Sequence, residues 1–378
     1  MKITYVAHSH IPSTTANSIH VMKMCQAFAQ EAADVALCVP GQKSDVEAID
    51  IFDFYGVPNG LFPIVKLPYS QMPGNTVSFA LRAVLRAKHE KSRVVYSRVE
   101  QPIMLTMLLN IPFVLELHNQ PQHRIFLGML PFWARSKKCI AIVVISRALK
   151  KHLINLGVQE KKIIVLPDAV DIESFPLHKS LTGKNLSKIR VGYTGHLYKG
   201  RGINIILEMA LKLVDIDFEF IGGNPEDIAF WEQKAKEKKI KNVTFSGFVP
   251  YRDIPSKLSQ FDILVMPYQK NVATHGNGSN TANFMSPMKM FEYMATGKAI
   301  VASDLPVLRE ILFDNWNCLL VPPDDIQKWI CAVKALADNP NLRARLGLQA
   351  RKDVENNFTW RKRANTILAV LQKYFKLI

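Results

Sequence analysis

The sequence predicts an α/β protein made of two doubly wound, Rossmann-like domains in tandem. Short Val- and Ile-rich runs alternate with longer amphipathic stretches almost from end to end, a pattern typical of βαβ units around a parallel sheet. This series occurs twice, and a segment with Pro and Gly but no clear periodicity separates the two occurrences. The 378 residues also match the length of about two domains.

The first series forms the predicted N-terminal domain, residues 1–170. Strands are expected at Ile3–Ala7, Val35–Val39, Val94–Tyr96, Phe113–Leu117, Ile140–Ile145 and Ile163–Leu166, with helices at Asn17–Gln30, Val77–Lys88, Pro102–Leu109 and Ala148–Leu156. Residues 171–187 are the predicted linker, because they contain turn formers and lack a regular apolar pattern.

The second series, residues 188–357, repeats the alternation. Strands are expected at Arg190–Tyr193, Phe218–Ile221, Val243–Phe245, Ile263–Val265, Ala299–Val301 and Cys318–Val321, with helices at Gly202–Leu213, Pro225–Lys238, Pro287–Ala295 and Ile326–Ala337. Residues 358–378 are predicted to form a C-terminal helix, with the option of packing back on the first domain. The carboxyl ends of both sheets are expected to face one interdomain cleft, where such sheets bind ligands.

Composition restricts the class of protein. With 48% hydrophobic and 21% charged residues the chain is globular in character, and no apolar run reaches the ~20 residues of a membrane span. The N-terminal residues Met1–His8 do not resemble a signal peptide. Five widely spaced cysteines without a C-x-x-C pair predict reduced, mostly buried thiols in a cytoplasmic protein, and neither disulfides nor a zinc site.

The net charge of +16 favours an anionic partner. Much of the excess positive charge lies in residues 123–162, a segment whose only acidic residue among its Lys and Arg residues is Glu160. The same segment contains the apolar stretch Phe126–Trp133, a combination expected of a surface that docks on anionic lipid headgroups. A buried helix with a solvated basic face explains it equally well. Nucleic acid is a weaker candidate, because aromatic residues do not alternate with the cations and no recognition motif occurs.

A glycine-rich turn, Gly195–Gly202, directly follows the strand predicted at Arg190–Tyr193. Its glycines would let the backbone approach a ligand, the next helix offers unpaired N–H groups, and Lys199 and Arg201 add positive charge. These features suit a phosphate or diphosphate. The turn is neither a P-loop nor a G-x-G-x-x-G fingerprint, so a glycine turn with solvent-facing cations remains an alternative.

A second candidate ligand site begins at Ser286. Ser286 fits a helix N-cap and Pro287 the first helical position, so the helix would present free N–H groups. Glu292, about a turn and a half along, would reach a sugar hydroxyl attached to the bound phosphate, although an isolated helical Glu is usually solvated. The preceding Gly- and Asn-rich loop, Asn271–Met285, fits a ligand lid or a sugar pocket.

In the first domain, His118 and Asn119 follow a predicted strand at the edge where ligands bind. Histidine can donate a hydrogen bond or share a proton near neutral pH, but a single His at a strand end is more often structural. No cluster of His, Cys and carboxylates has metal-ligand spacing, and no G-x-S-x-G elbow occurs.

Together these pieces resemble glycosyltransferase family 4, a family of retaining enzymes with the GT-B fold. The resemblance covers nearly the whole chain and is carried by Ala16–Met24, Glu116–His118, Val144–Ser146, Leu166–Asp171, Tyr193–Leu197, Arg201–Gly202 and Ser286–Glu310. It implies a donor site for a nucleotide diphosphate sugar in the second domain, an acceptor site in the first, and no need for a metal or another cofactor.

Carried over by position, the resemblance also implies site residues. His118 would lie beside the reacting sugar, Arg201 would bind the donor diphosphate, and Glu292 would hold the ribose as the second glutamate of an E-x7-E motif. The donor contacts would be Gly195, His196, Lys199, Arg201, Gly223, Asn280, Asn283, Ser286, Pro287, Met288, Lys289 and Glu292, and the acceptor contacts Ser13, Asn17 and His118.

Two departures from the family pattern concern the donor site. Phe284 replaces the first glutamate of the motif, so Asn280 or Asn283 would substitute in holding the transferred sugar. His196 replaces the usual arginine after Gly195. Both changes leave diphosphate binding intact in principle.

The sequence therefore predicts a retaining, metal-independent glycosyltransferase that uses a saccharide or lipid-linked acceptor in cell-surface polysaccharide or glycolipid biosynthesis. Its expected location is the cytoplasm, with residues 123–162 as a candidate contact to the inner face of the membrane. Two alternatives remain: a nucleotide-sugar epimerase of the same fold, which needs no acceptor, and a non-catalytic basic protein that docks on membranes.

Overall fold

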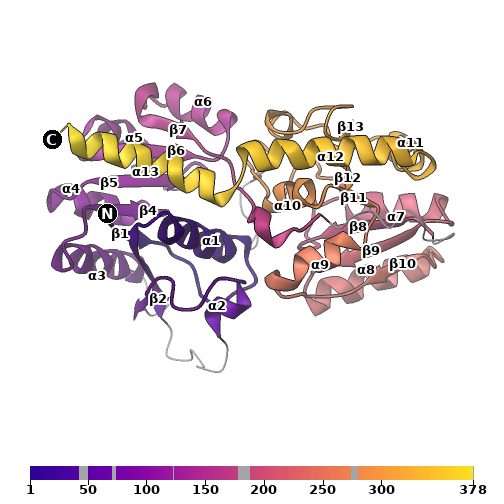
Figure 1. Cartoon of the computed structure of the whole chain (residues 1–378), viewed down its shortest axis with the longest axis horizontal. Helices are drawn as coiled ribbons and strands as arrows, with labels where there is room; N and C mark the ends of the chain where they lie inside the picture. Colours follow the sequence, from indigo (N-terminus) through magenta and orange to yellow (C-terminus); the bar gives the residue numbers. More distant parts are fainter. Residues whose placement is uncertain (42–49, 70–73, 122, 178–187, 274–279, 378) are drawn as a thin grey trace. The chain divides into compact units, whose positions relative to one another are not determined.

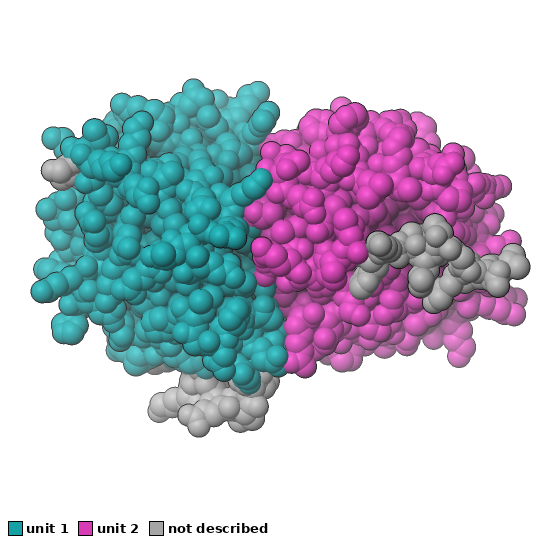
Figure 2. Space-filling view, in the orientation of Figure 1, with its two compact units in different colours: residues 1–168, 360–378 teal, residues 169–359 magenta. Residues whose placement is uncertain are grey.

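The computed structural model describes residues 1–41, 50–69, 74–121, 123–177, 188–273 and 280–377 (Figure 1). The chain divides into two compact units: unit 1 contains Met1–Asp168 and Trp360–Ile378, and unit 2 contains Ala169–Thr359 (Figure 2). Each unit has its own parallel sheet with helical connections. The α/β class and the two doubly wound sheets predicted from the sequence are confirmed.

The sheet of unit 1 has seven strands in the order β3-β2-β1-β4-β5-β6-β7, and its strand pairs are parallel. The strands are β1 (Lys2–Val6), β2 (Asp34–Gly41), β3 (Ile64–Pro68), β4 (Val94–Ser97), β5 (Phe113–Leu117), β6 (Cys139–Val144) and β7 (Ile163–Val165). The chain order reverses between β1 and β4. Doubly wound sheets bind ligands beside such a reversal, at the carboxyl ends of the strands.

Helices connect these strands and a last helix returns from the far end of the chain. They are α1 (Ala16–Gln30), α2 (Ile51–Phe54), α3 (Asn75–His89), α4 (Gln101–Leu108), α5 (Arg124–Arg135), α6 (Arg147–Asn155), the 3-10 turn Glu160–Lys162, and α13 (Trp360–Lys376), while the 3-10 turn Ile172–Ser174 belongs to unit 2. The Thr15 side chain caps α1 by accepting a hydrogen bond from Ser18 N. Helix α13, yellow in Figure 1, packs on α1 and β6 and so completes unit 1.

The sheet of unit 2 has six strands in the order β10-β9-β8-β11-β12-β13. They are β8 (Arg190–Thr194), β9 (Asp217–Ile221), β10 (Val243–Phe245), β11 (Ile263–Met266), β12 (Ala299–Ser303) and β13 (Leu319–Val321). Its helices are α7 (Ile203–Lys212), α8 (Pro225–Glu237), α9 (Ile254–Ser259), α10 (Met288–Thr296), α11 (Ile326–Asp338) and α12 (Pro340–Asn357), with 3-10 turns at Tyr251–Asp253 and Leu308–Glu310. The order reverses between β8 and β11, which places a candidate ligand site after these two strands.

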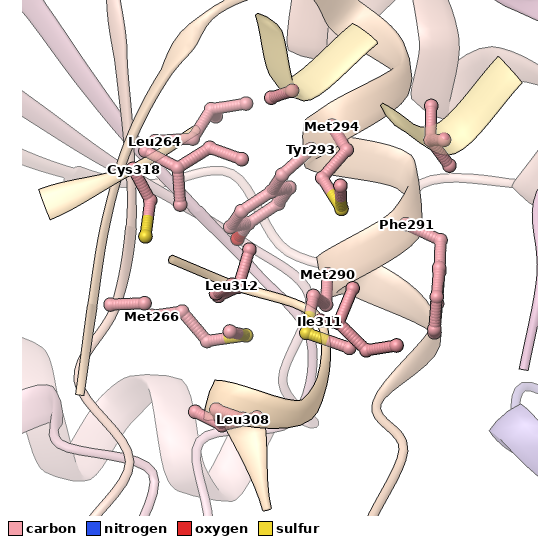
Figure 3. Packing of buried hydrophobic residues seen from close by; sticks show 14 of the residues in the cluster. Leu264, Met266, Met290, Phe291, Tyr293, Met294, Leu308, Ile311, Leu312 and Cys318 are labelled. Atoms are coloured by element: carbon pink, nitrogen blue, oxygen red, sulfur yellow. The ribbon is translucent and has the colours of Figure 1, made fainter. Parts of the chain in front are cut away.

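Helix α10 is embedded in one hydrophobic core of unit 2. Met290, Phe291, Tyr293 and Met294 are at most 1% exposed and pack with residues of β11 and β12 (Figure 3). Each buried side chain of this size contributes roughly 1.5 to 3 kcal/mol to stability. The core therefore fixes the first turn of α10 at the carboxyl side of the sheet.

The structure adds elements that the sequence pattern did not reveal. Strand β3 lies at the edge of its sheet and is only partly buried, so its apolar signal is weak. Helix α5 contains Pro131 and mixes apolar with basic residues, which obscured its helical period. The predicted linker lies mostly outside the described residues, since 178–187 are not described.

Two further features bear on the sequence predictions. Among the described helices, none combines the length and apolar character that a membrane span requires. Cys25, Cys38, Cys139 and Cys318 are buried, Cys331 is exposed, and all five are free thiols. The prediction of mostly buried thiols is therefore confirmed.

Candidate active site

Two glycine turns provide the backbone of a candidate site in unit 2. Gly195 follows β8 with φ +117°, and Gly222 follows β9 with φ +105°. Gly195 N donates a hydrogen bond of 2.8 Å to Ile221 O, and a Cβ atom on Gly222 would lie 2.6 Å from Gly195 O. Because neither position accommodates a side chain, bare backbone lies at the carboxyl ends of β8 and β9, as close approach of a ligand requires.

Two basic side chains lie near the Tyr268 ring, and one of them, Lys289, lies beside this backbone. A Cβ atom on Gly195 would come within 2.9 Å of Lys289 Nζ, which lies 3.8 Å from the centre of the Tyr193 ring and 5.5 Å from that of Tyr268. Arg201 Nη1 donates a hydrogen bond of 2.7 Å to Tyr268 Oη. Within the described part of the chain, Lys289 Nζ and Arg201 Nε have no hydrogen-bond partner. The site therefore holds basic groups that an anion can engage.

Helix α10 is attached to the end of β8, because Thr194 N donates a hydrogen bond of 2.8 Å to Tyr293 Oη. The helix begins at Met288, and Pro287 is its N-cap with an extended ψ of 125°. The prediction of Ser286 as N-cap and Pro287 as the first helical residue was therefore wrong by one residue. The N–H groups of this first turn face the carboxyl side of the sheet, where a helix N-terminus favours negative charge.

Glu292 is buried in α10, with 6% of its surface exposed. Burial and the Glu292 carboxylate raise the pKa of Tyr251 well above its usual value. The alternative of a merely solvated glutamate is thus wrong. Its assignment to a ribose hydroxyl stays a prediction.

In the turn Gly195–Gly202, the other two glycines pack against neighbouring backbone, whereas Lys199 lies at the surface. Cβ atoms on Gly200 and Gly202 would lie 2.0 Å from Asn271 O and 1.9 Å from Pro267 O, so these glycines allow close packing of the chain on itself. The prediction that they also open the backbone to a ligand stays a prediction. Lys199 is exposed.

His196 and Gly223 complete the predicted donor set on these two turns. The His196 ring stacks on Tyr198 at 4.7 Å. At Gly223, a Cβ atom would meet Leu197 Cδ1 at 2.7 Å. Both residues therefore shape their own turns, and their contact with a donor stays a prediction.

The polar loop before α10 is only partly described, because residues 274–279 lie outside the described ranges. Asn280 Oδ1 accepts hydrogen bonds from Val272 N and Ala282 N, and its Nδ2 donates to Lys270 O and Asn271 Oδ1. These four bonds occupy the Asn280 amide within the loop, which leaves the exposed Asn283 as the freer of the two predicted sugar contacts.

Unit 1 contains a buried charged network centred on Glu116 of β5. Its fully buried carboxylate accepts hydrogen bonds from Tyr96 Oη, from Arg363 Nη2 at 3.1 Å and from His118 Nε2 at 2.6 Å. Burial favours the neutral acid, but Arg363 and His20 hold the pKa of Glu116 well below its usual value. The carboxylate is therefore ionised and paired.

His20 of α1 extends this network to Asp168 at the end of unit 1. Its Nε2 lies 2.8 Å from Glu116 Oε1 and its Nδ1 3.0 Å from Asp168 Oδ1. Burial opposes ionisation of Asp168, yet His20 and His118 lower its pKa. A chain of alternating acidic and basic groups thus runs beneath His118.

His118 is the member of the network nearest to solvent, with 25% of its side chain exposed. Burial and the Arg98 guanidinium lower its pKa to about 4, so the imidazole is neutral at physiological pH. Because Nε2 carries the proton donated to Glu116, Nδ1 keeps a lone pair. His118 is thus arranged to accept a hydrogen bond, for example from a sugar hydroxyl.

The ligand atoms of His20, Glu116 and His118 lie within 4.8 Å of one another, a spacing that a metal could use. Their sequence separation explains why no motif suggested it. However, Arg363 Nη2 is 3.1 Å from the same Glu116 oxygen and already neutralises the carboxylate. A divalent cation would face this buried guanidinium directly, so the arrangement fits an ion-pair network better than a metal centre.

The predicted acceptor residues Ser13 and Asn17 flank the start of α1. Ser13 Oγ hydrogen bonds with Thr15 Oγ1 at 2.9 Å and with Ser18 Oγ at 3.0 Å. Asn17 Nδ2 donates a hydrogen bond of 2.5 Å to Ser9 Oγ. Both side chains therefore organise this loop, and their contact with an acceptor stays a prediction.

Sequence reasoning missed several members of both sites. His20 and Asp168 lie in stretches that carried the family resemblance, so position alone offered a signal for them. Arg363 lies 247 residues from Glu116 in a segment with no motif, and nothing local indicated its contact. Tyr268 follows β11 at the strand reversal, where topology rather than sequence marks it.

Comparison with known families now places the chain. The family described as "Glycosyltransferase Family 4" matches residues 18–174, and "Glycosyl transferases group 1" matches residues 188–339. Residues 18–174 thus belong to glycosyltransferase family 4, and residues 188–339 to glycosyl transferases group 1. The first match contains the strands of the unit 1 sheet except β1, and the second contains the sheet of unit 2. The buried network of unit 1 lies within the first match apart from Arg363 of α13.

Individual relatives are more distant. An uncharacterized glycosyltransferase of Methanocaldococcus jannaschii is 27% identical over 236 residues, which are 60% of this chain and 56% of that protein. The phosphatidyl-myo-inositol mannosyltransferase of Mycolicibacterium smegmatis is 26% identical over 52% of this chain and 48% of its own. The chain thus spans about half the length of these curated relatives.

Solved structures extend the likeness over the whole chain. Anabaena HepE in complex with UDP-glucose superposes with a TM-score of 0.74 at 16% identity, covering 99% of this chain and 100% of its own. A glycosyltransferase of Rickettsia africae gives 0.75 at 16% identity, covering 99% and 98%. At these identities the likeness concerns the fold, which is GT-B as expected from the sequence.

Proposed function

We propose that the protein is a retaining, metal-independent glycosyltransferase that uses a nucleotide diphosphate sugar. The observation that carries this proposal is the Lys289 side chain against the bare backbone of Gly195, with Arg201 held nearby through Tyr268. An anion with several oxygen atoms satisfies these groups together. The fold shared with HepE, whose structure contains UDP-glucose, supports a nucleotide sugar as that anion.

The chemistry follows from where negative charge develops. As the bond between the anomeric carbon and the diphosphate breaks, an acceptor hydroxyl oxygen would bond to that carbon and its proton would pass to the leaving diphosphate. The charge that the diphosphate gains would be stabilised by Arg201 and the N–H groups at the start of α10. Glu292 would hold the ribose, and His118 Nδ1 would accept a hydrogen bond from the transferred sugar. The residues thus bind, orient and stabilise charge, and none of them needs to form a covalent bond.

The acceptor is proposed to be a saccharide or lipid-linked molecule of cell-surface polysaccharide or glycolipid biosynthesis. The named mannosyltransferase relative acts, by its name, on a phosphatidyl-inositol. In unit 1, α5 buries Leu130, Trp133 and Ala134 but exposes Ile125 by 74% and Phe132 by 61%. Exposed apolar side chains next to Arg124 and Arg135 suit contact with an anionic lipid surface.

A thermal-shift screen tests the donor site. Nucleoside diphosphates and nucleotide sugars are added without metal, since a ligand at 100 times its dissociation constant stabilises the folded protein by about 2.7 kcal/mol. A selective shift with one base, lost in Arg201→Ala and Glu292→Ala, is the expected result. A shift that appears only with added divalent metal would overturn metal independence, and no shift with any member would favour a protein that does not bind nucleotides.

Transfer and membrane contact need separate assays. Conversion of the bound donor without an acceptor into another nucleotide sugar would favour the epimerase alternative.

For the membrane, reversing the charges of Arg135, Lys137 and Lys138 should abolish salt-sensitive binding to anionic vesicles. The matched control reverses Lys236, Lys239 and Lys241, exposed lysines of unit 2, and should bind as wild type. Equal binding of all three proteins would leave α5 as a helix with a solvated basic face.

A further inference from the structure

Lys289 has an unusual environment for a lysine. The residue is 9% exposed, and its Nζ has no hydrogen-bond partner among the described residues. Most buried ammonium groups are paired, because transfer of an unpaired charge from water into protein is costly. The position of Nζ is nevertheless well defined, 3.8 Å from the centre of the Tyr193 ring.

The groups around Nζ come from four parts of unit 2. Tyr193 belongs to β8, Tyr268 follows β11, Arg201 precedes α7, and Glu292 lies on α10 itself. The two tyrosine rings can stabilise an ammonium group through cation–π interaction, and Glu292 also favours the charged form. Burial and Arg201 oppose it more strongly, so the pKa of Lys289 lies well below its usual value. The neutral amine is therefore more accessible to Lys289 than to an ordinary lysine.

An anion at Gly195 would reverse this balance. Nζ points at the bare backbone of Gly195, where even a methyl group would come within 2.9 Å of it. A diphosphate placed there would add negative charge next to both Nζ and Arg201. It would offset the repulsion by Arg201 and provide the oxygen acceptor that Nζ lacks.

We propose that Lys289 binds the donor diphosphate directly and takes up a proton from solvent as the diphosphate arrives. The neutral amine gains one proton, and the resulting ammonium pairs with a phosphate oxygen. This assignment rests on the proposed donor site and extends it, because it makes Lys289 a charge-switching ligand and not only part of a helix N-terminus. Since the protonated form binds, donor affinity must fall as pH rises through the pKa of bound Lys289.

Calorimetry can measure how many protons the protein takes up when it binds a nucleotide. Binding of UDP, GDP, ADP and dTDP is measured at several values between pH 7 and 9 in two buffers of different ionisation enthalpy. At pH 8.5 the nucleotide phosphates are already fully ionised, because their last pKa is about 6. A substantial fraction of one proton per bound nucleotide should therefore be taken up, and this proton must come to the protein.

Three variants separate the roles of Lys289. Lys289→Met should lose the proton uptake and bind the nucleotide about 10- to 100-fold more weakly. Lys289→Arg should retain much of the affinity but take up no proton, because arginine is charged at every pH used. Lys298→Met is the matched control, since Lys298 follows α10 at its other end and also has a pKa lowered by burial. It should behave as wild type.

The outcomes distinguish this inference from the proposed function. If wild-type protein binds no nucleotide in any buffer, the donor site itself is wrong. If it binds a nucleotide without proton uptake, or if the uptake persists in Lys289→Met, the site stands and the role of Lys289 is overturned. Should Lys289→Met fail to fold, Lys289→Arg still decides the question, because persistent uptake in that variant contradicts the proposal.

Discussion

The two units treat buried charge in opposite ways. In unit 1, Glu116 is ionised but surrounded by Arg363, His20 and His118, so the network is balanced within the protein. In unit 2, Arg201 and Lys289 lie together and form no ion pair with a described carboxylate. The first arrangement is complete without a ligand. The second, by the proposal above, is completed by an anion.

This difference indicates whether each group of charges mainly positions side chains or mainly attracts a ligand. A balanced network positions its members, because every hydrogen bond restricts another group. An unbalanced pair of basic groups creates a positive electrostatic potential that stabilises a bound anion. Variants in unit 1 should therefore affect stability first, whereas variants in unit 2 should affect ligand binding and turnover first.

The largest expected effect is on the stability of unit 1. Glu116→Gln removes the carboxylate that is hydrogen-bonded to the buried Arg363 and should lower the free energy of unfolding by about 3 to 5 kcal/mol. Lys289→Met, in contrast, should leave it unchanged or raise it. Hydrogen exchange of the β5 amides measures the first effect, and the double variant Glu116→Gln/Arg363→Met should recover part of the loss. Equal destabilisation by Glu116→Gln and Lys289→Met would remove the contrast between the units.

Loss of a cation in unit 2 should act on turnover. Arg201→Ala is expected to reduce turnover about 10²- to 10³-fold, because it removes a group that stabilises the leaving diphosphate. The rate of nucleoside diphosphate release measures this effect. Arg190→Ala is the control, since Arg190 lies at the opposite end of β8 and pairs with Glu219 at 2.6 Å. An active Arg201→Ala protein would contradict the proposed donor site.

The two units should also respond to opposite ends of the pH scale. Glu116 and Asp168 have lowered pKa values, so their contribution to stability is present above the ordinary carboxyl pKa of about 4 and is lost as the pH falls through the folded-state values.

For Lys289, whose folded-state pKa is also lowered, the unfolded chain binds more protons, so stability should rise with pH toward the ordinary lysine value. Each such group changes the unfolding free energy by at most about 1.4 kcal/mol per pH unit. Denaturant unfolding of wild type, Glu116→Gln and Lys289→Met across pH 3 to 10 would show both slopes. If one of these pH slopes of the unfolding free energy persists in the variant that lacks the corresponding group, another titrating group causes that slope.

The smallest expected effect concerns His118. His118→Ala removes one neutral hydrogen bond to the sugar and should lower turnover several-fold to about tenfold. Because the pKa of His118 is about 4, the wild-type rate should show no inflection from this residue between pH 5 and 8. The exposed His123 provides the control, and His123→Ala should retain full activity. An inflection near pH 6.5 that disappears in His118→Ala would show that this imidazole titrates in the working enzyme.

The sequence predicted best what local pattern determines. The strand Phe113–Leu117 was placed correctly because a fully buried strand has a continuous apolar run apart from Glu116. Gly195, Arg201 and Lys289 were named as candidate donor contacts because they flank a strand end and a helix start; the structure brings Lys289 to Gly195, and their contact with a donor stays a prediction. The partner of Glu116 was not predictable, since no rule of spacing joins two positions 247 residues apart. The interior position of Glu292 likewise depends on packing around α10 and not on its own helix pattern.

The return of α13 to unit 1 has a consequence for synthesis on the ribosome. Unit 2 ends at Thr359, whereas unit 1 needs Trp360–Ile378 for its last helix and for Arg363. A ribosome that adds about 5 to 20 residues per second releases the first 168 residues well before this helix. Glu116 thus lacks its guanidinium partner while the rest of the chain is made. The unit encoded first is therefore the one that finishes folding last.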